Sequence, residues 1–129
     1  MDTTLTAPRG RAGRFAYGSL AALLLAAVAF EAARHGTGYW QIGVFGIGPD
    51  LALFVGVSGG LEPGRLHPRA VRLYNALHRF FGPIVLAAVA AFGVAPLGFF
   101  IGALAWAFHI SLDRALGYGL RTRDGFQRA

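Results

Sequence analysis

Residues 80–108 read FFGPIVLAAVAAFGVAPLGFFIGALAWAF, and this segment constrains the fold most strongly because it runs for 29 residues without a charged side chain. As one helix rising about 1.5 Å per residue it would be roughly 43 Å long, too long for a hydrocarbon core of about 30 Å. Residues 93–98 (GVAPLG) lie at its centre, and Gly and Pro interrupt helices. The stretch therefore predicts a hairpin of two helices, each of which needs residues from its outer flank to complete a span.

The composition points to a membrane rather than to water. Of the 129 residues 55% are apolar and only 14% charged, with a mean hydropathy of +0.51. A soluble domain of this length would have too few charged residues for its surface. The length predicts one unit, so we expect a single membrane domain over residues 1–129.

Four spans account for the apolar segments: about 15–33, 39–57, 73–94 and 97–118. The first is interrupted only by Ser19 and Glu31. The second begins with Tyr39 and Trp40, an aromatic pair typical of a membrane interface. It also contains Pro49, which removes a backbone donor and predicts a break. The fold class expected is an all-α integral membrane four-helix bundle.

The first apolar segment also fits a cleaved signal peptide. Arg9, Arg11 and Arg14 precede it, and residues 27–29 (AVA) are small enough for a cleavage site. The segment continues past that site, which favours a retained span.

Charge predicts the orientation. The net charge of +6 comes from arginine alone, since the chain has no lysine. Four spans place eleven arginines on one side and Arg34 alone on the other, whereas three spans would divide them seven against five. Arginines near span ends favour the cytoplasm. Both termini are therefore expected there, with residues 1–14 and 119–129 as basic tails.

The same arginines bear on partners and location. They lie beside apolar runs rather than among stacking aromatics, which favours anionic phospholipid head groups over nucleic acid. A homo-oligomer or another membrane subunit remains a possible partner. Richness in Ala, Gly and Arg suggests a GC-rich bacterial genome, so we expect a multi-pass protein of the bacterial inner membrane.

Four ionisable residues fall inside the predicted spans, at similar depth: Asp50, His78, His109 and Asp113. Counting from the outer ends places them about 11 to 17 residues in, roughly 16–26 Å at helical rise. His109 and Asp113 are four residues apart and share a helix face. Ionisable groups within a membrane mark functional sites by default. Two imidazoles and two carboxylates suit a divalent ion such as zinc, manganese or iron.

Neighbouring residues are candidates for supporting this site. Tyr74 and Asn75 precede His78 by four and three residues, so either can orient the imidazole, and Arg114 adjoins Asp113. Glu31 is expected outside the cluster, paired with Arg34 or His35.

The cluster has three interpretations. A bound metal ion can lower the pKa of water toward about 7 and support hydrolysis near the cytoplasmic face. Alternatively, the groups only pair with one another and lock the helices of a noncatalytic subunit or scaffold. A proton or ion pathway is the third. Whether the protein is an enzyme stays open, and the absence of cysteine excludes only thiol chemistry.

Three motifs carry a resemblance: Pro49-Asp50, the pattern Tyr74-Asn75-x-x-His78, and the pattern His109-x-x-x-Asp113-Arg114-x-x-Gly117-Tyr118-Gly119. Over about residues 31–120 they resemble a family of small uncharacterised bacterial integral membrane proteins, a domain of unknown function. The resemblance implies a four-helix membrane fold and marks the same polar positions. The arrangement is also loosely similar to small membrane proteins classed as metal-dependent hydrolases.

Overall fold

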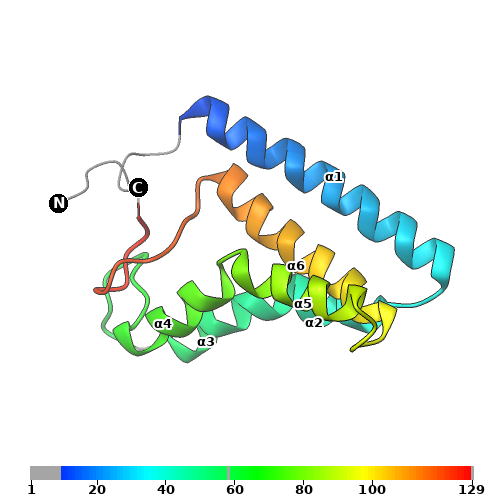
Figure 1. The fold of residues 1–129 in the computed structure, drawn as a ribbon. Coiled ribbons are helices and arrows are strands. Elements are labelled where there is room, and N and C mark those ends of the chain that lie inside the picture. Colours follow the sequence, from blue (N-terminus) through cyan, green and yellow to red (C-terminus); the bar gives the residue numbers. More distant parts are fainter. Residues whose placement is uncertain (1–9, 58, 129) are drawn as a thin grey trace.

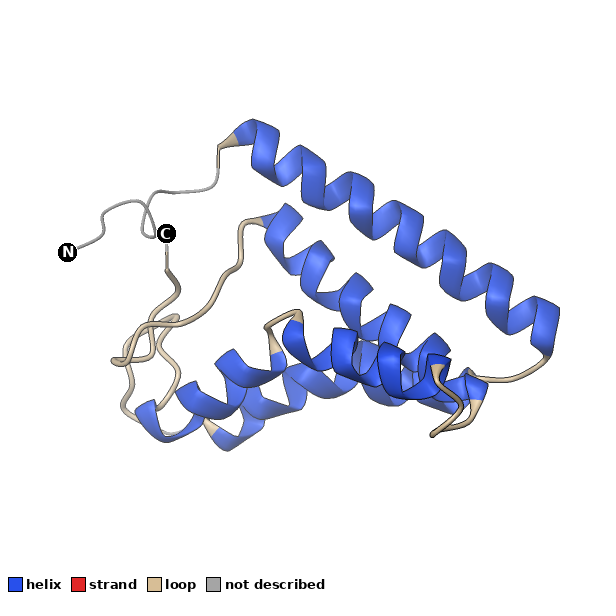
Figure 2. Ribbon diagram, in the orientation of Figure 1, coloured by secondary structure: helices blue, strands red, loops and turns tan. Residues whose placement is uncertain are grey.

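The structure is a computed structural model that describes residues 10–57 and 59–128. Its helices follow in the order α1 (Arg11–His35), α2 (Tyr39–Ile47), the 3-10 helix η2 (Gly48–Leu51), α3 (Ala52–Val55), α4 (Pro68–Leu77), α5 (Phe81–Ala91) and α6 (Leu97–Leu116). The described residues form no β-strand (Figure 2), and their one β-bridge joins Arg121 to Gln127. The expected all-α fold is confirmed.

Two helices are long and apolar enough to cross a membrane, α1 with 25 residues and α6 with 20. Helices α4 and α5 are long and apolar enough only when taken together, and the pair is bent by 41°. Residues Tyr39–Val55 form a shorter apolar helical stretch. Large apolar side chains of α1 point outward: Phe15 is 77% exposed and Leu23 70%. A helix with this much exposed hydrocarbon suits lipid rather than water. The chain therefore has the helices of a membrane protein.

Helix α6 is the centre of the fold, because α1, α2 and α5 all pack against it. Val28 and Ala32 of α1 form a core cluster with Ile101 and Ala105 of α6. Small residues elsewhere on α6 and its neighbours let helices approach closely, as they do in membrane bundles. Gly82 of α5, for example, lies directly against the Trp106 ring.

The predicted hairpin in residues 80–108 is confirmed. Helix α5 ends at Ala91, Gly93 has a positive φ of 77° that favours glycine, and α6 begins after Pro96. The expected break at Pro49 is also present, where the 3-10 helix η2 separates α2 from α3. Both breaks follow from Gly and Pro in the sequence.

A further break divides the stretch that we expected as one span over residues 73–94. Helix α4 already begins at Pro68 and ends at Leu77, and α5 begins at Phe81. Pro83 supplies a physical reason, because its ring clashes with the carbonyl four residues earlier and it has no N–H to donate. That carbonyl belongs to Arg79, inside the break.

The segment after α6, which we expected as a basic tail, is hydrogen-bonded to the rest of the protein. The Leu66 N–H donates to the Gly125 carbonyl at 2.9 Å, and the Arg65 Nε donates to the Asp124 carbonyl at 2.7 Å. This segment, the α3–α4 loop and the start of α1 lie at one end of the molecule, and the α1–α2 and α5–α6 turns lie at the other (Figure 1).

We expect the α2–α6 contact to depend on Gly102. A Cβ there would lie 2.7 Å from the Phe45 ring and 3.0 Å from the Gln41 Cβ. Gly102→Ala should therefore destabilise the detergent-solubilised protein by about 1–3 kcal/mol, measured by thermal unfolding. Gly43→Ala is the matched control, because nothing lies within 4 Å of its added Cβ. Equal unfolding temperatures for the two variants would contradict this packing.

Candidate metal centre

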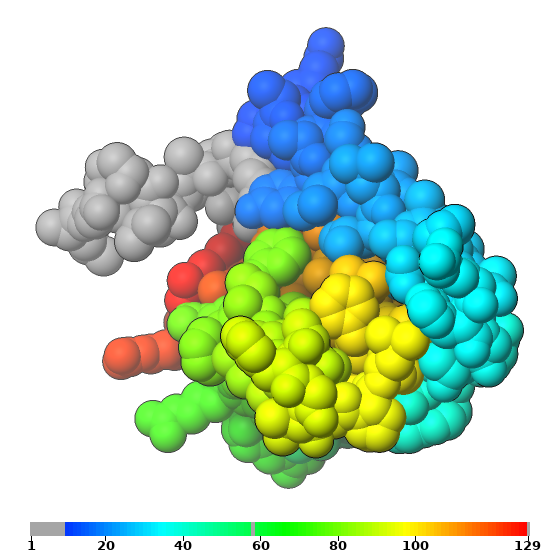
Figure 3. Space-filling view, turned by 45° about the vertical axis from the view of Figure 1, so that its right-hand side comes forward, coloured from blue at the N-terminus to red at the C-terminus, as the bar shows by residue number. Residues whose placement is uncertain are grey.

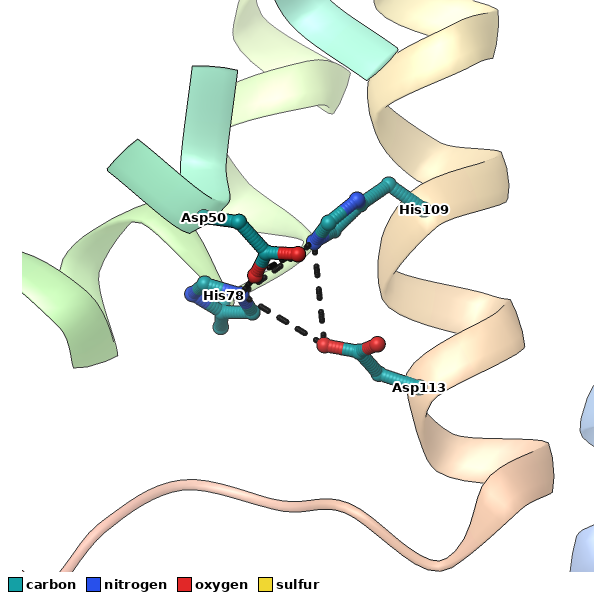
Figure 4. A group of neighbouring side chains, drawn as sticks. All are labelled: Asp50, His78, His109 and Asp113. Carbon is teal, nitrogen blue, oxygen red and sulfur yellow. Dashed lines mark hydrogen bonds and ion pairs between the residues drawn. The ribbon is translucent and has the colours of Figure 1, made fainter. Parts of the chain in front are cut away.

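Asp50, His78, His109 and Asp113, which sequence analysis expected at similar depth, lie together in the structure. Asp50 belongs to η2, His78 follows α4, and His109 and Asp113 lie one turn apart on α6 (Figure 4). One ligand atom from each of the four lies within 4.8 Å of the others. Side chains from three separate elements therefore converge on one point, and the group can hold a metal ion.

The distances between these atoms are close to the ligand–ligand distances of a tetrahedral metal site. The His78 Nε2 lies 3.3 Å from the Asp50 Oδ1, 3.4 Å from the Asp113 Oδ2 and 3.3 Å from the His109 Nε2. The His109 Nε2 lies 3.3 Å from the Asp50 Oδ1 and 3.7 Å from the Asp113 Oδ2. Tetrahedral ligands with bonds of about 2.0–2.2 Å are about 3.3–3.6 Å apart. These five of the six distances therefore fit one small cation, and all four ligand atoms lie within 4.8 Å of one another.

Each imidazole is held at its other nitrogen by a backbone carbonyl. The His78 Nδ1 is 2.8 Å from the Tyr74 carbonyl, and the His109 Nδ1 is 2.8 Å from the Gly46 carbonyl. A carbonyl only accepts, so both Nδ1 atoms must carry the proton and donate it. In the neutral tautomer this leaves both Nε2 lone pairs directed at the cluster, the arrangement that metal-binding histidines use.

The centre is closed on the imidazole side and open on the carboxylate side. His78 is fully buried and His109 is 9% exposed. The Asp113 side chain is 18% exposed and that of Asp50 47%. The carboxylates are therefore the more accessible side of the centre.

Helix α6 also supplies the donors for the break between α4 and α5. The Trp106 Nε1 donates to the Leu77 carbonyl at 2.7 Å, and the Arg114 Nη2 donates to the His78 carbonyl at 2.8 Å. Buried carbonyls without a helical partner need such donors. Arg114 thus lies at the site as expected, where it holds the His78 backbone. Trp106 was missed, although its place three residues before His109 puts it on the same helix face.

Of the other residues considered near the site, Tyr74 contacts the cluster, whereas Asn75 and Glu31 lie outside it. The Tyr74 ring stacks on the His78 ring with centroids 3.9 Å apart, so Tyr74 orients the imidazole through both its ring and its carbonyl. The structure does not bring Asn75 to the cluster. Glu31 lies outside it as expected and pairs with His35 at 3.2 Å.

These features define an all-helical protein with membrane-length apolar helices and a His–Asp cluster able to hold a metal ion. The chain belongs to the DUF4260 family, a domain of unknown function, which it matches over residues 17–129. The resemblance to an uncharacterised family is thereby confirmed. Comparison with curated proteins and with solved structures finds no match.

Asn75 instead secures the C-terminal segment, and we expect its substitution to release that segment. The Asn75 side chain donates to the Arg121 carbonyl at 3.0 Å and accepts from the Arg121 N–H at 2.7 Å. Asn75→Ala should speed trypsin cleavage after Arg121 and Arg123 at least several-fold. Leu73→Ala, at an exposed position of the same helix, is the control. Unchanged cleavage in Asn75→Ala would show that these two bonds do not hold the segment.

Proposed function

We propose that this protein is a four-helix integral membrane protein of the bacterial inner membrane, with both termini in the cytoplasm. Two features support the topology. The start of α1 and the C-terminal segment lie at the same end of the molecule (Figure 1), as an even number of spans requires. Arg34 lies at the opposite end of α1, apart from the arginines of the α3–α4 loop and C-terminal segment. That distribution follows the positive-inside rule.

We further propose that Asp50, His78, His109 and Asp113 bind a divalent ion: zinc, manganese or iron. One observation carries the proposal. With both Nδ1 atoms donating to carbonyls, the four atoms that face one another are all acceptors. Five of the six distances between these acceptors are 3.3–3.7 Å, and acceptors this close repel one another unless a cation lies between them. Two nitrogens and two carboxylate oxygens suit these borderline ions.

Protons are the alternative cation, and one contact disfavours them. If both imidazoles were protonated, each would pair with a carboxylate and the cluster would only lock the helices. The two Nε2–H groups would then face each other at 3.3 Å, with like charges inside a desolvated site. A single metal ion satisfies both nitrogens without that repulsion. The locking role and the proton pathway are thus the weaker proposals.

The open carboxylate side supports hydrolysis as the function of the bound ion. A divalent ion polarises a substrate oxygen and activates water near neutral pH. Substrate and water need one accessible side, and the half-exposed Asp50 side chain borders it. Asp113 lies in the last turn of α6, close to the end of the molecule that we place in the cytoplasm. We therefore propose a hydrolytic reaction near the cytoplasmic face.

The metal proposal is tested by elemental analysis of protein purified in detergent. Wild-type protein should contain about one equivalent of zinc, manganese or iron, and His109→Ala should lose it. His35→Ala is the matched control, because His35 pairs with Glu31 far from the cluster. Affinity should also fall as the pH is lowered, since protons compete for the ligand nitrogens and oxygens.

Two results would count against the proposal. If folded wild-type protein takes up none of the three ions, the metal proposal is wrong and the cluster only holds the helices together. The protein could also contain stoichiometric metal but show no chelator-sensitive hydrolysis of chromogenic carboxylic or phosphate esters. That result would support metal binding and contradict the proposed hydrolytic reaction.

The topology is tested by cysteine labelling, for which the chain is suited because it has no cysteine of its own. In spheroplasts, an impermeant maleimide should label Arg34→Cys and Val94→Cys, which lie at the turns opposite the termini. Glu62→Cys and Arg123→Cys should be labelled only after lysis. All four positions are exposed, so accessibility is matched. Labelling of Glu62→Cys before lysis would refute the four-span arrangement.

A further inference from the structure

A second polar site lies on the other side of α4 from the metal centre. An open cavity of about 750 Å³ is lined by α4, the α4–α5 break and the C-terminal segment. Arg72, Asn75 and Arg79 line it, whereas Tyr74 and His78 lie on the opposite face of the helix and contact the cluster. The C-terminal segment lies beside α4 at the surface (Figure 3, orange to red beside green). We call this space the arginine cavity.

Among the residues that the structure describes, five arginines line the arginine cavity and no carboxylate does: Arg72, Arg79, Arg121, Arg123 and Arg128. Within residues 10–57 and 59–128, the side chains of four of them (all except Arg121) make no hydrogen bond or ion pair. Like charges around one space repel one another unless an anion joins them. The cavity therefore has the electrostatics of an anion site.

Arg121 shows that the C-terminal side of the cavity is built rather than incidental. Its Nη1 donates to the carbonyls of Gly64 and Gly125 at 3.1 and 2.9 Å, and its guanidinium lies 5.0 Å from the Tyr74 ring centroid. Its Nε is buried without a hydrogen-bond partner. The two backbone bonds to Asn75 fix the same residue against α4. Arg121 thus carries a fixed positive charge at the wall of the cavity.

We infer that the arginine cavity binds the phosphate head group of an anionic phospholipid. Guanidinium groups pair with phosphate through two parallel hydrogen bonds, which favours phosphate among biological anions. Phe81 lines the cavity and is 75% exposed, and Ile84 and Val85, 63% and 43% exposed, continue from it along α5. A head group in the cavity can therefore lay its acyl chains along this apolar face. The inference rests on the membrane placement proposed above and is independent of the metal.

The test compares two variants of equal charge in the full-length protein. Arg72→Gln/Arg79→Gln removes two cavity arginines, and Arg11→Gln/Arg34→Gln removes two exposed arginines outside it. Binding of phosphatidylglycerol to detergent-solubilised protein is measured by native mass spectrometry. The cavity variant should bind about tenfold more weakly or worse, because charge-assisted hydrogen bonds are lost, and the control should stay within about twofold of wild type. Equal losses in both variants would mean diffuse attraction and would overturn the site.

Two further measurements distinguish a phospholipid site from a soluble-phosphate site and check the fold of the variant. Glycerol phosphate has the same phosphate without acyl chains, and it should bind far more weakly than phosphatidylglycerol. Equal affinity for the two would reassign the cavity to a soluble phosphate compound. The thermal unfolding temperature of Arg72→Gln/Arg79→Gln should match that of wild type, which confirms an intact fold without reference to the metal centre.

Discussion

The structure depends on how backbone carbonyls are satisfied where its helices break. In hydrocarbon, water cannot replace a missing helical hydrogen bond, so another part of the protein must donate. Helix α6 provides the donors: Trp106 for the carbonyl of Leu77 and Arg114 for that of His78, on either side of His109, which donates to the carbonyl of Gly46. One unbroken helix thereby supports two broken ones. The breaks are what place polar side chains inside an otherwise apolar protein.

The same constraint creates the chemistry of the cluster. His109 satisfies a carbonyl near the Pro49 break with its Nδ1, and this bond leaves its Nε2 directed at His78 and the two aspartates. His78 uses the Tyr74 carbonyl in the same way. Structural support and ligand orientation are thus performed by opposite nitrogens of the same rings. For this reason, helix locking and metal binding are not exclusive roles.

Much of the fold was predictable from the sequence, because hydrophobic length and Gly–Pro positions are local signals. The hairpin at residues 93–98 and the break at Pro49 were predicted in this way. The four cluster residues were found because each interrupts an apolar run at similar depth. The break after Leu77 was not predicted, since the proline that accounts for it, Pro83, lies several residues beyond it. The folded C-terminal segment was not predicted because hydrogen bonds between residues far apart in sequence hold it, and such bonds leave no signal in the composition.

His78 and Arg79 are consecutive, yet one faces the cluster and the other the arginine cavity. The peptide unit between them lies in the α4–α5 break, and its carbonyl accepts a hydrogen bond from Arg114. If anion binding displaces this peptide unit, the backbone that carries the His78 imidazole is displaced with it. The two proposed sites are therefore connected through one peptide unit of the main chain. Any cooperativity between their occupants has to be reciprocal, with each altering the affinity of the other by the same factor.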